Sequence, residues 1–160
     1  MIVGPMKVSA IYNVAVAGQT TTQMLANGST QVDSLFASGK ENIVIVLEGT
    51  NDLGMLQDAT AVYDNLVWYC NARRAAGFKV VIGTIPPSSF FSGAQETRRQ
   101  TVNTNLRANW ATFADALADF AADSRLSNNL NSTYYTDGTH WTQAGCQAAA
   151  EIVAMALITL

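Results

Sequence analysis

One stretch constrains the fold of this chain more than any other, the continuous apolar run Ile-Val-Ile-Val-Leu at residues 43–47. A β-branched run without alternating polar residues predicts a strand that is covered on both faces, as in parallel sheets. Further strands are expected at 7–16 and 79–85, with longer helical patterns between them. Such alternation predicts a parallel sheet between two layers of helices, that is, a three-layer α/β/α domain.

The helical segments are bounded by recognisable caps. A polar, Thr-rich helix start at 19–22 comes after the first predicted strand and Gly18. Asp58 is the expected N-cap of a second helix that runs to Ala76 and stops at Gly77. Segment 114–120 is ambiguous, because its alanines favour a helix while its alternation and its place in the order favour a strand. We predict a strand there. The remaining helices are expected at about 94–110 and from Thr142 to the C-terminus.

Length and composition limit the class of protein. We assign the 160 residues to one domain, since that length can bury a sizeable core. No apolar stretch approaches the roughly 18 residues of a membrane span, so we expect a soluble globular protein. The net charge of −3 and the 13% of charged residues argue against a nucleic-acid partner, which would require a basic face.

The two cysteines, Cys70 and Cys146, do not form a metal motif, because there is no CxxC and only one histidine. Each lies in a helical pattern and is expected to be a small buried residue, with a disulfide as the alternative. The N-terminus lacks a signal-peptide pattern. Sequons at Asn27 and Asn131 are typical of an exported protein, but the sequence does not assign a localisation.

Polar and glycine residues follow each predicted strand. Gly18, 49–52, the loop 86–93 and the loop 137–140 all come after apolar runs. In open parallel sheets, ligands bind beyond the carboxyl ends of the strands. We therefore expect these four segments to meet at one edge of the sheet and to form the functional site. Phe90, Phe91 and Trp141 could form an apolar wall there, or pack in the core.

Asp137 and His140 form a D-x-x-H pattern in a short loop before the last helix. An Asp at this spacing can reach Nδ1 of the imidazole, fix its tautomer and stabilise the imidazolium that forms when Nε2 takes a proton. The alternative is an Asx-turn made by Asp137, with His140 simply on the surface. As His140 is the only histidine, any imidazole chemistry must depend on it.

Asn51 and Gly18 are candidates for binding a developing oxyanion. The amide of Asn51 directly follows the run 43–47, and the preceding Gly49 allows a sharp turn. Gly18 offers an unobstructed backbone N–H after the first predicted strand. Taken alone, each of these positions is as well explained by an ordinary tight turn.

In order along the chain, three blocks resemble one family. NVAVAGQTTTQML, IVIVLEGTNDL and YYTDGTHWTQAGCQAAAEI look like conserved blocks of the SGNH (GDSL) hydrolases, from about residue 7 to the C-terminus. The resemblance implies a flavodoxin-like fold, hydrolysis of carboxylic esters without metal or organic cofactor, and a small-molecule ester substrate. It also implies that His140 and Asp137 are catalytic and that Gly18 and Asn51 are oxyanion-hole donors.

The family's first block, a Gly-Asp-Ser motif on a central strand, is absent. The nucleophile is therefore unknown, and we expect the sequence to be truncated at its N-terminus relative to the family. Ser88, Ser89, Ser92 and the threonines at 20–22 could lie near the site, but in the family these regions only shape the pocket. Without a nucleophile, His140 could still activate water, or the chain could be an impaired remnant or a module that binds acyl groups or glycans.

The missing strand also bears on assembly. Segments 7–16 and 43–47 would flank it, and both would be left with unpaired backbone groups. We expect the two segments to pair directly, or a symmetric homodimer to cover or complete the sheet, with the dimer favoured. A flavodoxin-type nucleotide or flavin binder is the least supported reading, because no Gly-rich phosphate loop follows any strand.

Overall fold

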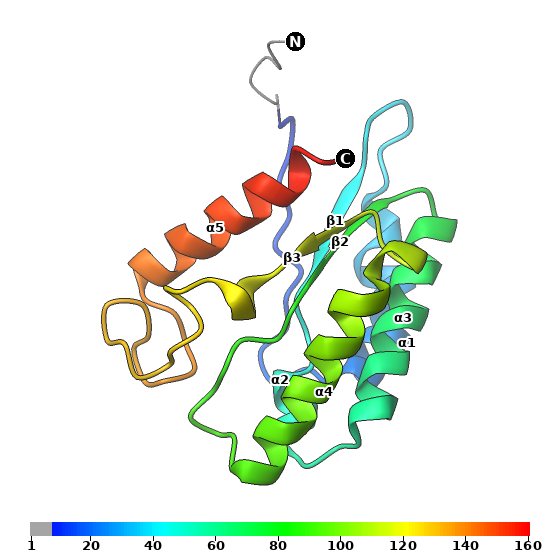
Figure 1. Cartoon of the computed structure of the whole chain (residues 1–160). Coiled ribbons are helices and arrows are strands. Elements are labelled where there is room, and N and C mark those ends of the chain that lie inside the picture. Colours follow the sequence, from blue (N-terminus) through cyan, green and yellow to red (C-terminus); the bar gives the residue numbers. More distant parts are fainter. Residues whose placement is uncertain (1–7) are drawn as a thin grey trace.

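The computed structural model describes residues 8–160 and contains a three-stranded parallel sheet (Figure 1). The strands are β1 (Ile43–Val46), β2 (Lys79–Gly83) and β3 (Ala116–Ala118), in the order β1-β2-β3. Val44 is opposite Val80, and Ile82 is opposite Leu117. The strand predicted within 114–120 is thus confirmed, although it is only three residues long.

Helices cover both faces of this sheet, as expected for an α/β/α domain. In Figure 1, α1, α3 and α4 lie on one side of the strands and α5 lies on the other. The helices are α1 (Thr21–Gln31), α2 (Thr50–Gly54), α3 (Ala59–Ala75), α4 (Gly93–Asn109) and α5 (Gln143–Leu157), with short 3-10 turns at Asp33–Leu35, Trp110–Thr112 and Phe120–Ala122.

Side-chain caps explain where three helices begin, and one of them, Asp58, is the N-cap predicted from the sequence. The Thr20 side chain accepts from Gln23 N–H in a capping box, Asp58 accepts from the N–H of Thr60 at 2.8 Å, and Thr142 accepts from that of Gly145. Each interaction satisfies a backbone donor that the first turn of a helix leaves without a partner. The local sequence therefore determines these boundaries.

Two apolar clusters hold the layers together. One fills the space between the sheet and α1, α3 and α4 and includes Val46, Leu66, Ile82 and Leu106. The other lies under α5, where Val81, Ala116 and Ala148 are buried. β2 contributes buried residues to both clusters and is covered on both faces, which is why its sequence is almost uninterruptedly apolar. The prediction that the strand at 43–47 is covered on both faces is wrong for β1, because Ile45 is 49% exposed.

The strand predicted at 7–16 is not found. Residues 8–16 have no regular secondary structure and all of them are exposed, Ile11 by 85%; Lys7 lies outside the described residues. Direct pairing of this segment with β1 is also wrong, because β1 pairs only with β2. A strand forms only where another strand accepts its backbone hydrogen bonds, and within residues 8–160 the segment has no such partner.

The cysteines are both free, so the disulfide alternative is wrong. Cys70 is fully buried in α3 as expected, and burial raises the pKa of its thiol to about 12. Cys146 is instead exposed on α5. Within residues 8–160, no helix combines the length and apolar character needed to cross a membrane.

Candidate active site

The loop before α5 brings Asp137 and His140 into direct contact. Oδ2 of Asp137 lies 2.7 Å from Nδ1 of His140. The other carboxylate oxygen, Oδ1, accepts the backbone N–H of Thr139 at 2.9 Å and that of His140 at 2.8 Å. The carboxylate of Asp137 therefore makes both the Asx-turn and the contact with the imidazole. The sequence had left these two as alternatives.

These donors change the acidity of Asp137. The backbone N–H of His140, then the His140 side chain, lower the pKa of the carboxyl to about 2. Asp137 thus remains an anion facing Nδ1 across the whole neutral range. The imidazole itself is 73% exposed, so Nε2 is accessible to substrate or water.

Backbone contacts fix the shape of this loop. Tyr135 and Trp141 form an isolated antiparallel bridge, and Thr136 N–H donates to the carbonyl of His140 at 2.8 Å. At the tip, Gly138 has φ of 79°, a conformation that favours glycine. The side chain of Asn129 donates to the Gly138 carbonyl at 3.0 Å. His140 therefore lies in a turn that is closed by backbone and side-chain hydrogen bonds.

Asn51 and Gly18 meet at the carboxyl end of β1. The Asn51 amide donates to the carbonyl of Gln19 at 2.8 Å, which places it beside the Gly18–Gln19 turn. That contact uses one of the two amide hydrogens and leaves one available. Gly18 has φ of 75°, and its N–H has no hydrogen-bond acceptor within residues 8–160. The Asn51 side chain is thus hydrogen-bonded to the residue that directly follows Gly18.

Gly49 explains how Asn51 reaches this place. Its φ of 114° belongs to the region that favours glycine, as the sequence suggested. A Cβ at Gly49 would also lie 2.7 Å from Cδ1 of Ile85, so a larger residue would collide with the core. The chain can therefore turn directly from β1 into α2 only with glycine at this position.

A buried interaction that the sequence did not predict lies next to Asn51. Asp52, only 2% exposed, accepts the backbone N–H of Thr21 at 3.0 Å and the Thr21 hydroxyl at 2.7 Å. The amide of Asn65 in α3 donates to the same hydroxyl. Asp52 thereby ties the first turn of α1 to α2. An Asp directly after Asn51 was the only signal in the sequence, and it does not reveal a partner 31 residues away.

The serine-containing loop joins the two halves of the site. Ser88 Oγ lies 2.7 Å from Oγ1 of Thr139, and Ser89 Oγ donates to the carbonyl of Asp137 at 3.0 Å. The next residue, Phe90, lines a pocket together with Asn51. The expectation that these segments converge at one edge of the sheet is confirmed by these contacts.

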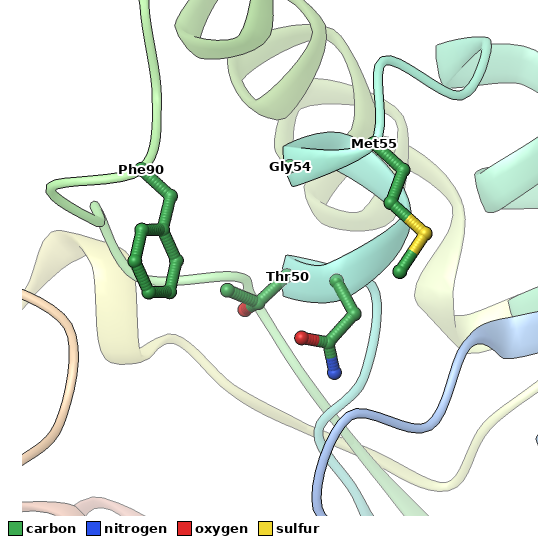
Figure 2. Close-up of a pocket in the computed structure, with 5 residues that line it drawn as sticks. Thr50, Gly54, Met55 and Phe90 are labelled. Carbon is green, nitrogen blue, oxygen red and sulfur yellow. The ribbon is translucent and has the colours of Figure 1, made fainter.

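The pocket beside Asn51 has a volume of about 340 Å³ and is lined by Thr50, Asn51, Gly54, Met55 and Phe90. Figure 2 shows Thr50 between the side chains of Phe90 and Met55. Of the three aromatic residues considered for an apolar wall, only Phe90 takes part. Phe91 packs against the core, and Trp141 packs against Phe120 with a centroid distance of 5.7 Å.

No nucleophile is hydrogen-bonded to the imidazole. All ten serines lie within residues 8–160, and none of their hydroxyls makes a hydrogen bond to His140. The hydroxyl of Ser88, 5% exposed, is engaged by Thr139 and by the N–H of Phe90. The same part of the chain contains no group of three or more His, Cys, Asp or Glu side chains that could hold a metal ion.

Glu48 is a further titratable group at this edge. It is the last residue before Gly49, and its Oε1 accepts the Gly49 N–H at 3.0 Å. Burial raises the pKa of this carboxyl to about 7, with a further contribution from Asp52. Glu48 therefore changes charge near neutral pH, next to the turn that carries Asn51.

The fold and this edge define a class, the α/β/α proteins whose site lies at the carboxyl ends of parallel strands. The sequence profile of the GDSL-like Lipase/Acylhydrolase family matches residues 4–148. The chain belongs to this family of SGNH (GDSL) hydrolases, as its three blocks indicated.

Solved structures agree on the fold. A GDSL-like lipase from Bacteroides thetaiotaomicron has 22% identity and a TM-score of 0.72 over 89% of this chain and 73% of that one. A lipolytic G-D-S-L family member from Veillonella parvula has 20% identity and a TM-score of 0.71, covering 89% and 77%. A carbohydrate esterase family 3 protein from Talaromyces cellulolyticus has 24% identity and a TM-score of 0.66, covering 88% and 67%. Comparison with curated proteins gave no match.

Proposed function

We propose that this chain hydrolyses carboxylic esters with His140 as the base and Asp137 as the group that orients it. The observation that carries the proposal is the 2.7 Å contact between Asp137 Oδ2 and His140 Nδ1. With Nδ1 donating to the carboxylate, Nε2 carries the lone pair and can accept a proton. The exposure of the ring leaves this nitrogen accessible to a reactant.

Asn51 and Gly18 serve as the oxyanion hole in this proposal. Their amide and backbone donors stabilise the negative charge that develops on the carbonyl oxygen during attack. The support is the free N–H of Gly18, the second hydrogen of the Asn51 amide, and the hydrogen bond from Asn51 to Gln19 that holds them together. The pocket beside Asn51 then receives an apolar part of the ester, next to Phe90 and Met55.

Water is the proposed nucleophile, because no serine is hydrogen-bonded to His140. Nε2 removes a proton from water while the water oxygen bonds to the carbonyl carbon. The bond to the alcohol oxygen then breaks, and the proton on Nε2 passes to that oxygen, giving acid and alcohol. In triads that lose the nucleophile, about 10³–10⁴-fold catalysis over water remains, so slow turnover is expected.

Hydrolysis of p-nitrophenyl acetate, compared between the wild-type chain and His140→Ala, tests this function. We expect measurable turnover that is lost in the variant and retained in Lys40→Ala, which alters an exposed loop residue. Circular dichroism of each protein controls for folding. Turnover that is equal in His140→Ala and the wild type would contradict the proposal.

The second candidate is a non-catalytic module that binds acyl groups or glycans with the same pocket. The lack of a hydroxyl bonded to His140 favours it over ordinary acyl-enzyme chemistry. NMR titration with acetate and with a short oligosaccharide distinguishes the two. Binding near Phe90 without any His140-dependent turnover would support the module and exclude the hydrolase.

A further inference from the structure

Three side-chain hydroxyls lie between the loop at 86–93 and the turn at 137–140. They belong to Ser88, Ser89 and Thr139, and together they are called the hydroxyl cluster below. Oγ1 of Thr139 lies 2.7 Å from Oγ of Ser88 and 3.0 Å from Oγ of Ser89. The hydroxyl cluster therefore joins two segments that are about 50 residues apart in the sequence.

The direction of each hydrogen bond in the hydroxyl cluster follows from a count of protons, since a hydroxyl donates only one. Ser89 Oγ donates to the carbonyl of Asp137, and a carbonyl can only accept. Thr139 must then donate to Ser89, and it is left to accept from Ser88. Ser88 Oγ in turn accepts the N–H of Phe90 at 3.1 Å. One directed series therefore runs through the site, from the N–H of Phe90 to Ser88, Thr139, Ser89 and the carbonyl of Asp137.

The two ends of this series lie in the two parts of the site. Phe90 lines the pocket beside Asn51 (Figure 2), and Asp137 contacts Nδ1 of His140. The side chains of Asp137 and His140 are 52% and 73% exposed, so packing does little to fix their position. Hydrogen bonds in which each group both donates and accepts polarise and strengthen one another. A change at one end of the series is therefore transmitted to the other.

We propose that Ser88 and Thr139 are positioning residues that couple the pocket wall at Phe90 to the orientation of His140. An intact series keeps the turn at 137–140, and with it Nε2 of the imidazole, at a fixed place relative to the pocket. Ser88 is only 5% exposed, and its hydroxyl both donates and accepts, which satisfies a buried polar group. The catalytic consequence of this coupling rests on the proposed function, whereas the coupling itself does not.

Solution NMR of the whole chain tests the coupling without substrate. Thr139→Val removes the hydroxyl and interrupts the series. The N–H of Ser89 still donates to the carbonyl of Gly138 at 2.8 Å in this variant, so the turn stays attached to the loop. We expect the amide signal of Phe90 and the imidazole nitrogen signals of His140 to shift together. Thr139→Ser, which keeps the hydroxyl, should restore both sets of signals.

Two further variants make this test specific. Thr133→Val is the matched control, because it makes the same substitution at an exposed position whose hydroxyl has no hydrogen-bond partner within the part of the chain that the structure describes. It should leave the signals of Phe90 and His140 unchanged. Ser89→Ala interrupts the series at an exposed residue and should shift the same signals, even where Thr139→Val fails to fold.

Turnover of p-nitrophenyl acetate gives the catalytic readout. One hydrogen bond is worth up to about tenfold in an equilibrium. Ser88→Ala and Thr139→Val should therefore lower kcat by roughly three- to tenfold with KM nearly unchanged, and Thr139→Ser should recover it. A wild type without turnover that depends on His140 would refute the proposed hydrolysis, while the NMR experiment would still decide the coupling.

Two results would overturn the coupling. One is that the signals of Phe90 and His140 stay unchanged in Ser89→Ala and in folded Thr139→Val. The other is a shift in Thr139→Val that Thr139→Ser fails to restore, which would assign the effect to the shape of the side chain and not to its hydroxyl.

Discussion

Asp137 binds His140 twice, through Oδ2 to Nδ1 of the imidazole and through Oδ1 to the backbone N–H of the same residue. One carboxylate thus fixes both the ring and the turn that carries it. This division matters for experiments, because an amide can replace the oxygen that holds the turn but cannot supply the charge that faces the imidazole.

Asp137→Asn should therefore lower ester turnover by orders of magnitude with little loss of thermal stability. The Asn oxygen still accepts the N–H groups of Thr139 and His140, while the productive tautomer is lost; in well-studied triads this costs about 10⁴-fold. Nitrogen-15 NMR of His140 should show the proton on Nδ1 in the wild type and a changed tautomer in the variant. Equal turnover in the two proteins would refute the orienting role.

Acid titration of Asp137 provides a test without substrate. Carbon-13 NMR of its carboxyl should give a midpoint of about 2, and the midpoint should rise toward 3.8 in His140→Ala. The rise should be partial, because the backbone N–H of residue 140 remains. As the pKa is lowered in the folded state, the stabilisation is present above pH 3.8 and is lost as the pH falls through about 2. An unchanged midpoint in the variant would show that the imidazole does not act on Asp137.

Asn51→Ala should reduce kcat by about 10²–10³-fold, the usual cost of removing one oxyanion donor, with little change in KM. The variant also loses the hydrogen bond to Gln19, so its unfolding midpoint must be measured alongside. A pure effect on KM would mean that Asn51 contacts only the ground state of the substrate.

A serine-directed fluorophosphonate should not label the chain. Ser88 is buried, and the hydroxyls of Ser88 and Ser89 are engaged by Thr139 and Asp137. Intact-mass spectrometry after incubation would reveal any adduct. Stoichiometric labelling at either residue would identify a relocated nucleophile and replace water in the proposed reaction.

Glu48→Gln should stabilise the protein above neutral pH. In the wild type, burial raises the pKa of Glu48 from 4.5 to about 7 in the folded state, so stability declines as the pH rises from 4.5 to about 7. After allowance for partial exposure, the gain in the variant is on the order of 1–2 kcal/mol at pH 8. Denaturant unfolding at pH 4 and pH 8 measures it, and the two proteins should converge at pH 4. A difference that is the same at both pH values would assign the effect to packing.

Local chemistry explains which elements the sequence predicted correctly. Asp58 and Thr142 cap their helices through backbone groups two and three residues away, and the apolar run 43–47 contains β1. Segment 8–16 has the same strand-like composition, yet a strand depends on a partner edge, which composition does not encode. The contact between Asp137 and His140 joins residues three positions apart, so the sequence could indicate it. The contact between Asp52 and Thr21 spans 31 residues and was not predicted, because sequence spacing does not encode it.

The buried Asp52 has a consequence for how this domain can vary. The carboxylate of Asp52 holds the start of α1 against α2. The turn that contains Gly18 is therefore fixed to Asn51 by these direct contacts, and not by the chain that runs between them. The spacing between Gly18 and Asn51 therefore does not depend on the stretch between α1 and β1. Insertions or deletions around residues 36–41, which are mostly exposed, should leave the geometry of the two donors unaltered. This loop is accordingly the place where the domain can accept a fused tag or label without disturbing its chemistry.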